Sequence, residues 1–365
     1  MANLIERLRA WTWHAQGLAR EAESPARALA NVIGAYSSHP TAPLTLLARA
    51  HFDRAAFDAL EAERRAVRLP GPRGSIFLLP VETAARVRAA TAVPVAKLVP
   101  RLEWAGLSLA AYEALKPRIL EALAEPLAAA DLERRVPVPD VKVDVAARTM
   151  AHEGLVLRLA GSLRTDRLRY VATEAWLGAP LETPPAAESL AWLAGEYLRA
   201  FGPATIADFA WWAGVTRTAA RAAVAAHETA DAGDGHLLPA ASLAAWERTP
   251  PIPAGAITLL PKWDALIMGY APAGRARFID AAHLALAYSR GGTGGAGATS
   301  GDGLPLVLHE GRAVANWSHS FAGNRMTVTV RPWESRALSL EAVRPGLDEI
   351  GRLLGATSVE VSFAT

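Results

Sequence analysis

Apolar positions in the first hundred residues recur every three or four places, with one polar interruption. The spacing predicts helices over residues 3–13, 25–33, 44–50 and 54–65. Ser24-Pro25 suits the start of the second helix, because serine caps helix N-termini and proline fits the first turn. The interruption, residues 35–43, combines Ser, His, Thr and Pro. Residues 66–80 place two short apolar runs around Pro-Gly-Pro, which predicts a pair of strands.

The pattern changes near residue 115, where three helices are followed by two strands. The predicted helices cover residues 115–124, 128–135 and 143–154, and the strands cover 155–158 and 168–171. This order is typical of a winged helix, whose hairpin forms the wing. The connection between the strands carries Arg164 and Arg167, at the place where a wing contacts the phosphate backbone.

A second unit of this kind begins near residue 188. A helix over 190–200 precedes Gly-Pro, Thr205 caps a helix over 206–213, and Thr216 caps another over 217–226. Gly214 between them gives the spacing of a helix-turn-helix, and Arg217 and Arg221 share one face of the second helix. Paired short helices also occur without any DNA contact, so that alternative stays open.

The chain beyond residue 250 is rich in predicted strands. These cover 256–260, 304–309, 313–317, 326–330 and 358–363, with a helix over 340–354. The glycine-rich stretch 290–303 lacks the strand–glycine–helix context and the Lys-Ser/Thr of a phosphate loop, so nucleotide binding there is rejected.

The predicted fold class is therefore mainly α with β (α+β), with tandem winged-helix units and a C-terminal β-rich domain. We place the domains at 1–105 (helical or winged-helix), 106–182 (winged helix), 183–250 (helix-turn-helix or winged helix) and 251–365 (β-rich, with the glycine-rich loop).

Composition removes several classes of chemistry. The chain has no cysteine, which excludes disulfides, iron–sulfur clusters, thiolate zinc sites and cysteine nucleophiles. Its nine histidines show no His-x-His or His-x-x-x-His spacing, so we expect neither a metal site nor a cofactor. No signal peptide and no transmembrane segment is predicted. We expect a cytoplasmic monomer with no membrane partner.

Charge alone does not indicate a nucleic-acid partner. The 38 basic and 36 acidic residues give a net charge of +2, so any anion-binding surface must concentrate its basic side chains locally. Only four of the basic residues are lysines, at positions 97, 116, 142 and 262, and the others are arginines.

Several segments distributed along the chain carry a family resemblance. They are residues 13–18 (Trp-His-Ala-Gln-Gly-Leu), 44–49, 73–80 (Arg-Gly-Ser-Ile-Phe-Leu-Leu-Pro), 202–214 and 259–270, the most specific being 202–214. In these residues, and in their order, the chain resembles the winged-helix family of AlkZ-like DNA glycosylases.

The resemblance implies tandem winged helices around a DNA-binding channel for duplex DNA. It implies excision of bulky or cationic N7-alkylated purines, including adducts of an antibiotic, as self-resistance by base excision repair. The family's catalytic motif is Gln-apolar-Gln, or Gln-x-Asp in a sister group, just before the helix that here begins at Leu44. This chain departs from it, because the matching place has Tyr36-Ser37-Ser38-His39.

Cleavage of an N-glycosidic bond passes through an oxocarbenium-like sugar, and a cationic N7-alkylpurine leaves without a strong general acid. A hydrogen-bonding pair that orients water then suffices. Ser38 and His39 are the predicted pair, with His39 accepting a proton from water, and Tyr36 is predicted to stack on or hydrogen-bond to the extruded nucleotide. Ser-Ser-His-Pro is also ordinary helix-capping and loop sequence, so this role competes with a purely structural one.

The predicted DNA contacts are arginines. Arg49 and Arg73 join the four arginines of the two winged-helix units, although Arg73 also suits a solvated turn after Pro-Gly-Pro. Asp264 lies among apolar residues and is interpreted as a structural acid or helix N-cap. No lysine precedes residue 97 to form a Schiff base, which predicts a water nucleophile and no lyase activity. The N-terminal amine stays open as an alternative nucleophile.

Two other functions remain open. The missing glutamines favour a non-catalytic DNA-binding protein, either a transcriptional regulator or a lesion sensor. Winged helices also bind proteins, so an interaction scaffold is the third hypothesis.

Overall fold

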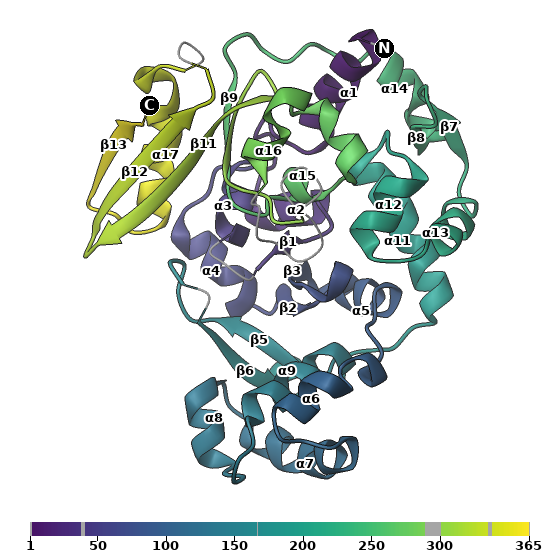
Figure 1. The fold of residues 1–365 in the computed structure, drawn as a ribbon, viewed down its shortest axis with the longest axis vertical. Helices are drawn as coiled ribbons and strands as arrows, with labels where there is room; N and C mark the ends of the chain where they lie inside the picture. Colours follow the sequence, from purple (N-terminus) through teal and green to yellow (C-terminus); the bar gives the residue numbers. More distant parts are fainter. Residues whose placement is uncertain (1, 38–40, 166, 289–300, 335–337, 365) are drawn as a thin grey trace. The chain divides into compact units, whose positions relative to one another are not determined.

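The computed structural model describes residues 2–37, 41–165, 167–288, 301–334 and 338–364. It divides into two compact units (Figure 1). The first unit combines residues 1–36, 41–58 and 194–365, and the second combines 37–40 and 59–193. Compactness therefore does not follow sequence order, since the N-terminal helices share a unit with the C-terminal half. The four predicted domain boundaries stay a prediction.

The second unit is built on an antiparallel sheet in the order β3-β2-β5-β6-β4. Its strands are β2 (Ala66–Pro70), β3 (Ile76–Pro80), β4 (Leu127–Ala128), β5 (Val156–Ala160) and β6 (Leu168–Ala172). Register places one residue of each strand in a single row, namely Leu78, Arg68, Arg158, Tyr170 and Leu127. Directly opposed residues of antiparallel strands project from the same face, so two arginines are neighbours on this sheet.

The second unit has six complete α-helices among its described residues. They are α5 (Val81–Ala90), α6 (Val99–Trp104), α7 (Leu109–Ala122), α8 (Ala129–Arg135), α9 (Val143–Glu153) and α10 (Thr173–Leu177). Four of them, α6 to α9, contribute to one hydrophobic core. Buried side chains such as Tyr112, Ile119 and Met150 join α7 and α9 to the sheet. Gly154, in the left-handed region at φ 82°, ends α9 before β5. The predicted succession of three helices and a hairpin is confirmed here by α7, α8, α9 and β5–β6.

A helix-turn-helix lies in the first unit. It follows α11 (Ala186–Phe201) and consists of α12 (Ile206–Ala213) and α13 (Arg217–Val224), with the hairpin of β7 (Thr229–Asp231) and β8 (Leu237–Pro239) after it. Thr205 and Asp208 cap α12 reciprocally, Gly214 turns the chain at φ 75°, and Thr216 caps α13. Helix α12 has the predicted boundaries and α13 begins at the predicted residue, as the local capping residues dictate, whereas α13 ends at Val224 instead of at residue 226.

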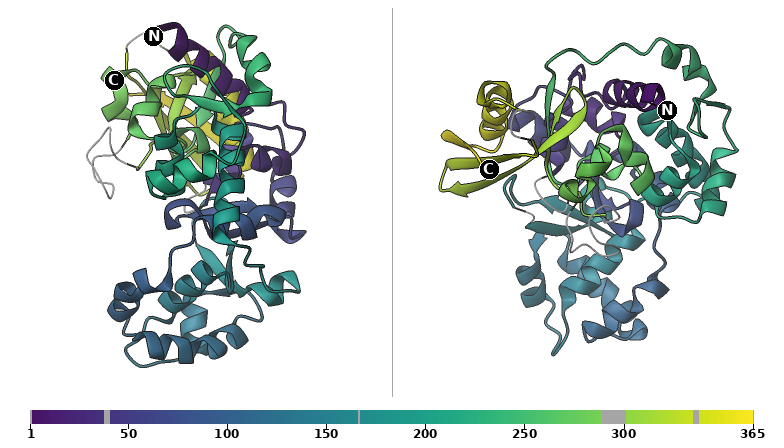
Figure 2. Two further views of the ribbon diagram at one scale, coloured as in Figure 1. Left: turned by 90° about the vertical axis from the view of Figure 1, so that its right-hand side faces the viewer. Right: turned by 45° about the horizontal axis from the view of Figure 1, so that its top comes forward.

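The C-terminal part of the first unit is a five-stranded sheet in the order β13-β12-β11-β10-β9. Its strands are β9 (Ile257–Leu260), β10 (Leu306–His309), β11 (Arg312–Ala322), β12 (Arg325–Pro332) and β13 (Ser358–Phe363). Helix α17 (Leu340–Leu353) connects β12 to the parallel strand β13 and packs against β13 and β9 (Figure 2). Buried Val343, Leu347 and Ile350 form its inner face. Most of the glycine-rich stretch, residues 290–300, lies outside the described residues.

The remaining elements complete the α+β class that the sequence predicted. They are α1 (Ala2–Ala15), α2 (Pro25–Asn31), β1 (Ala35–Tyr36), α3 (Thr41–Leu47), α4 (Arg54–Ala62), α14 (Leu243–Glu247), α15 (Ala265–Met268) and α16 (Leu284–Ala287). Ser24 caps α2 as expected, accepting a hydrogen bond from the Arg27 amide. In the described part of the chain, no helix has the length and apolar character needed to cross a bilayer.

Candidate functional site

The predicted catalytic segment is described at its first two residues. Tyr36 ends β1 with 4% of its surface exposed, and Ser37 follows it, equally buried. Ser38 and His39 lie outside the described residues, so their catalytic roles stay predictions.

A chain of polar contacts in the second unit holds Ser37. Its amide donates to the Ile76 carbonyl at 2.8 Å, and its Oγ accepts a hydrogen bond from Arg68 Nε at 2.5 Å. Arg68 is 3% exposed and forms an ion pair with Glu61, whose Oε2 accepts from the Ala160 amide at 3.1 Å. The residue before Ser38 is therefore tied, through Arg68 and Glu61, to the end of β5 at the base of the predicted wing.

Sequence reasoning missed this contact chain. Arg68 is the one charged residue in the strand Ala66–Pro70, and all five strand residues are buried. A buried charge must be paired, so a charge inside a buried strand was the available signal. Its partners, at positions 37 and 61, could not be read from spacing.

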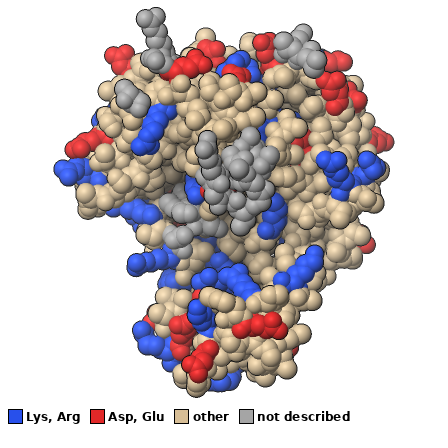
Figure 3. Space-filling view, in the orientation of Figure 1, with Lys and Arg blue, Asp and Glu red and all other residues tan. Residues whose placement is uncertain are grey.

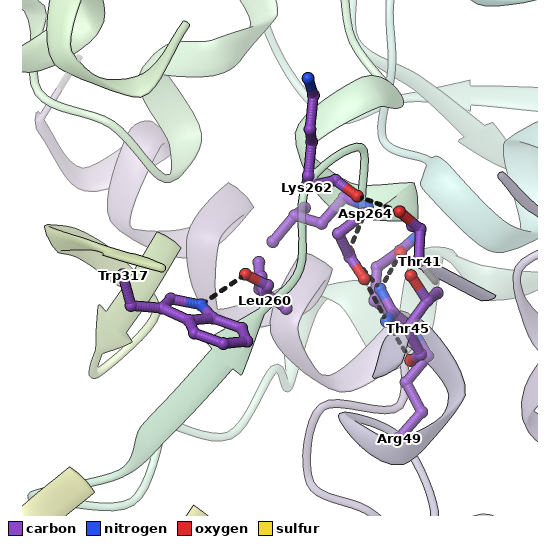
Figure 4. Close-up of polar contacts among 9 residues, drawn as sticks. Thr41, Thr45, Arg49, Leu260, Lys262, Asp264 and Trp317 are labelled. Carbon is purple, nitrogen blue, oxygen red and sulfur yellow. Dashed lines mark hydrogen bonds and ion pairs between the residues drawn. The ribbon is translucent and has the colours of Figure 1, made fainter. Parts of the chain in front are cut away.

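Helix α3, which follows the candidate segment, is fixed within the first unit by two side chains (Figure 4). Thr41 Oγ1 donates to the Lys262 carbonyl at 2.8 Å. Arg49 donates from Nη1 to Asp264 Oδ2 and from Nη2 to Asp264 Oδ1, both at 2.9 Å. Arg49 Nη1 also donates to the Thr45 carbonyl at 2.8 Å, which joins the ion pair to the helix itself.

This arrangement corrects the prediction that Arg49 contacts DNA. The side chains of Arg49 and Asp264 are both 0% exposed, and the guanidinium is bound in a bidentate pair, so no phosphate reaches it. The structural interpretation of Asp264 is confirmed, because its Oδ1 also accepts from the Leu266 amide and caps α15.

The other predicted DNA contacts lie at exposed or partly exposed places. Arg217 and Arg221 are exposed on α13, Arg167 is exposed in the β5–β6 connection, and Arg164 is partly exposed there. Arg73 lies in the 3₁₀ turn Pro72–Gly74 with φ 58°, in the left-handed region. Contact of these five arginines with DNA stays a prediction.

Comparison of the whole chain with known protein families and solved structures identifies its relatives. The family model described as DNA glycosylase AlkZ-like matches residues 9–356. The chain belongs to the AlkZ-like DNA glycosylase family. Among solved structures, the chain is similar to the Streptomyces sahachiroi DNA glycosylase AlkZ, with a TM-score of 0.74 over 98% of this chain and 99% of that chain. At 18% identity, this likeness shows a shared fold. A comparison with curated proteins gave no match.

Membership in the AlkZ-like family confirms the resemblance inferred from the sequence. It also sharpens the departure at residues 36–39, where Tyr-Ser-Ser-His stands in place of the expected glutamines. In this AlkZ-like chain, a cavity of about 310 Å³ lies between α3, β9 and α17, but no predicted site residue from the described ranges lines it. The described residues contain no group of three His, Asp or Glu side chains that could hold a metal ion.

His152 of α9, in the second unit, has a strongly shifted pKa. Burial, together with nearby Arg158 and Arg101, lowers the pKa of His152 from 6.5 to about 4. The imidazole is therefore neutral in the folded protein at pH 7.

The depressed pKa of His152 predicts acid sensitivity. Between about pH 6.5 and pH 4 the unfolded chain protonates this histidine while the folded protein does not, so stability falls as the pH falls through that window. The contribution is on the order of 2 kcal/mol, discounted for partial exposure. Denaturant unfolding from pH 7 to pH 4 measures it, with His152→Gln expected to show a correspondingly smaller loss than the wild type. Parallel curves for the two proteins would contradict the prediction.

Proposed function

We propose that the protein is a monofunctional DNA glycosylase that hydrolyses the N-glycosidic bond of bulky N7-alkylated purines, such as antibiotic–guanine adducts. Its partner is double-stranded DNA carrying the alkylated base, and it acts as a cytoplasmic monomer. The observation that carries the proposal is the family match over residues 9–356. The contact chain from Ser37 through Arg68 supports it, because a water-orienting segment needs a rigid attachment.

The proposed reaction uses the chain's own polar groups. The alkylated purine carries a positive charge, so the C1′–N9 bond breaks with its electron pair moving onto the base and neutralising it. Ser38 orients a water toward C1′, and His39 takes one proton from that water as its oxygen bonds to the sugar. Tyr36, preceding them on β1, contacts the extruded nucleotide.

Water is the proposed nucleophile because no lysine precedes residue 97. Strand nicking by a glycosylase requires an amine that forms a Schiff base with the sugar. Base release without strand cleavage is therefore the expected outcome.

The test is a duplex that contains one bulky N7-alkylguanine. We expect free modified base in the supernatant, an intact strand until alkali is added, and no covalent complex after borohydride treatment. If duplexes with several adduct types keep their bases at excess enzyme, the glycosylase proposal fails. A borohydride-trapped complex would overturn the water nucleophile alone.

A non-catalytic DNA-binding protein is the second candidate function. It is favoured by one observation, the absence of both family glutamines at residues 36–39. Binding of undamaged DNA with sequence preference, and without base release, would select a regulator or lesion sensor instead.

The proposed helix-turn-helix contact predicts a specific salt dependence. Arg217→Gln and Arg221→Gln are each expected to reduce the slope of log binding constant against log salt by about 0.9, because each removes one phosphate contact. Fluorescence anisotropy with a labelled duplex measures these slopes. Arg344→Gln is the matched control, since that arginine is already paired with Asp348 at 3.0 Å. Slopes equal to the control's would remove α13 from the DNA interface.

A further inference from the structure

Four side chains of the second unit form what we call the Arg158 cluster, namely Arg101 of α6, Arg148 and His152 of α9, and Arg158 of β5. Tyr170 of β6 contacts two of its arginines. The guanidinium carbon of Arg158 is 5.7 Å from the centroid of the Tyr170 ring, and Arg148 Nε donates to the Tyr170 hydroxyl at 3.0 Å. In the face drawn in Figure 3, basic side chains gather over the region where Figure 1 places β5 and α9.

The positive charge of the Arg158 cluster is not balanced within the described residues. Asp144, one turn before Arg148 on α9, pairs with Arg148 at 2.5 Å. Arg101 and Arg158 have no ion pair with any described residue, and the buried Nε of Arg158 has no hydrogen-bond partner among them. Two guanidinium charges are thus left over.

Burying Arg158 without a full set of partners is costly for the protein alone. Burial lowers the pKa of Arg158 to about 10, and Arg148 and Arg101 act in the same direction. A buried, incompletely paired cation is destabilising, and such arrangements are concentrated at functional sites. A bound anion would supply the missing acceptors and charge.

The cluster is connected to Ser37 through Arg68. Arg158 is the direct cross-strand neighbour of Arg68, and Arg68 holds Ser37. Opposed residues on neighbouring antiparallel strands have Cα atoms about 5 Å apart. The turn that carries Arg73 also borders the cluster, since a Cβ built on Gly74 would lie 3.5 Å from His152 Cε1.

We propose that Arg101, Arg148 and Arg158 form a binding site for a DNA backbone phosphate in the part of the second unit that holds Ser37. Guanidinium groups bind phosphate oxygens through paired, charge-assisted hydrogen bonds, which matches the unused donors here. Neutral His152 adds one N–H donor. The proposal rests on the proposed function, which makes DNA the ligand. It adds the residues that bind one of the DNA phosphates.

The first experiment measures binding of an undamaged duplex, independent of base release. Arg158→Gln and Arg101→Gln are each expected to weaken binding about tenfold at low salt and to reduce the salt slope by about 0.9. Arg134→Gln in the same unit, an exposed arginine paired with Asp131, is the matched control and should leave both unchanged. Thermal unfolding of each variant identifies any loss that comes from misfolding, and exposed Arg101 provides a second variant if Arg158→Gln is unstable.

The second experiment follows the His152 imidazole by NMR, with His152→Gln to assign its resonance. Duplex binding should raise the pKa of His152 by at least about one unit, because a phosphate offsets the surrounding positive charge. If inorganic phosphate raises the pKa of His152 by this amount and duplex leaves it unchanged, DNA is not the occupant of the site. Unchanged salt slopes in folded Arg158→Gln and Arg101→Gln would overturn the site itself. Weakened binding together with absent base release would leave the site standing while the glycosylase proposal fails.

Discussion

Asp264→Ala is expected to lower the free energy of unfolding by about 3–5 kcal/mol, the range for removing one partner of a buried ion pair. The substitution leaves the Arg49 guanidinium 0% exposed with no counter-ion. It also removes the cap of α15, because Asp264 Oδ1 accepts from the Leu266 amide. Chemical denaturation at pH 7 measures the loss.

Two controls separate the buried charge from other effects. Asp348→Ala breaks the exposed pair with Arg344 and should cost less than about 1 kcal/mol. The double variant Arg49→Met with Asp264→Leu removes both charges and should recover most of the loss, since no unpaired ion remains. A loss below 1 kcal/mol for Asp264→Ala would mean that water or another group solvates Arg49.

Arg49 also shows what could not be predicted from the sequence. Local signals fixed much of the fold correctly: Thr205, Gly214 and Thr216 delimit the helix-turn-helix, because caps and turns depend on neighbouring residues. The buried state of Arg49 depends on Asp264, 215 positions away in the chain. An arginine at the end of a helix gives the same sequence pattern whether it faces solvent or a distant carboxylate.

For the candidate site, too, the sequence predicted the position but not the long-range contacts. The departure from the family motif drew attention to residues 36–39, because the resemblance supplied the position. The attachment of Ser37 was not predictable, since Ser37, Arg68, Glu61 and Ala160 are far apart in the sequence and meet only when the sheet of the second unit forms. The grouping of the chain into two units has the same origin, in contacts between segments far apart in sequence.

His39→Ala is expected to slow base excision by about 10²–10⁴-fold, the usual contribution of a general base. Ser38→Ala should slow it less, because a hydroxyl orients the water but takes no proton. Single-turnover release of an N7-alkylguanine base gives both rates, and duplex affinity should stay within about twofold because neither side chain is assigned a phosphate. His51→Ala, at an exposed histidine, and Ser108→Ala, at the cap of α7, are the matched controls.

The two variants also decide between the enzyme and the binding protein. If His39 is the base, the wild-type rate decreases as the pH drops below the pKa of the histidine, and the His39→Ala variant loses this pH dependence. A purely structural effect of the substitution lowers the rate equally at every pH. Full activity in both variants would move the chemistry away from residues 36–39. Activity absent from wild type and variants alike, with DNA affinity retained, would leave the contact chain through Arg68 as a support for DNA binding alone.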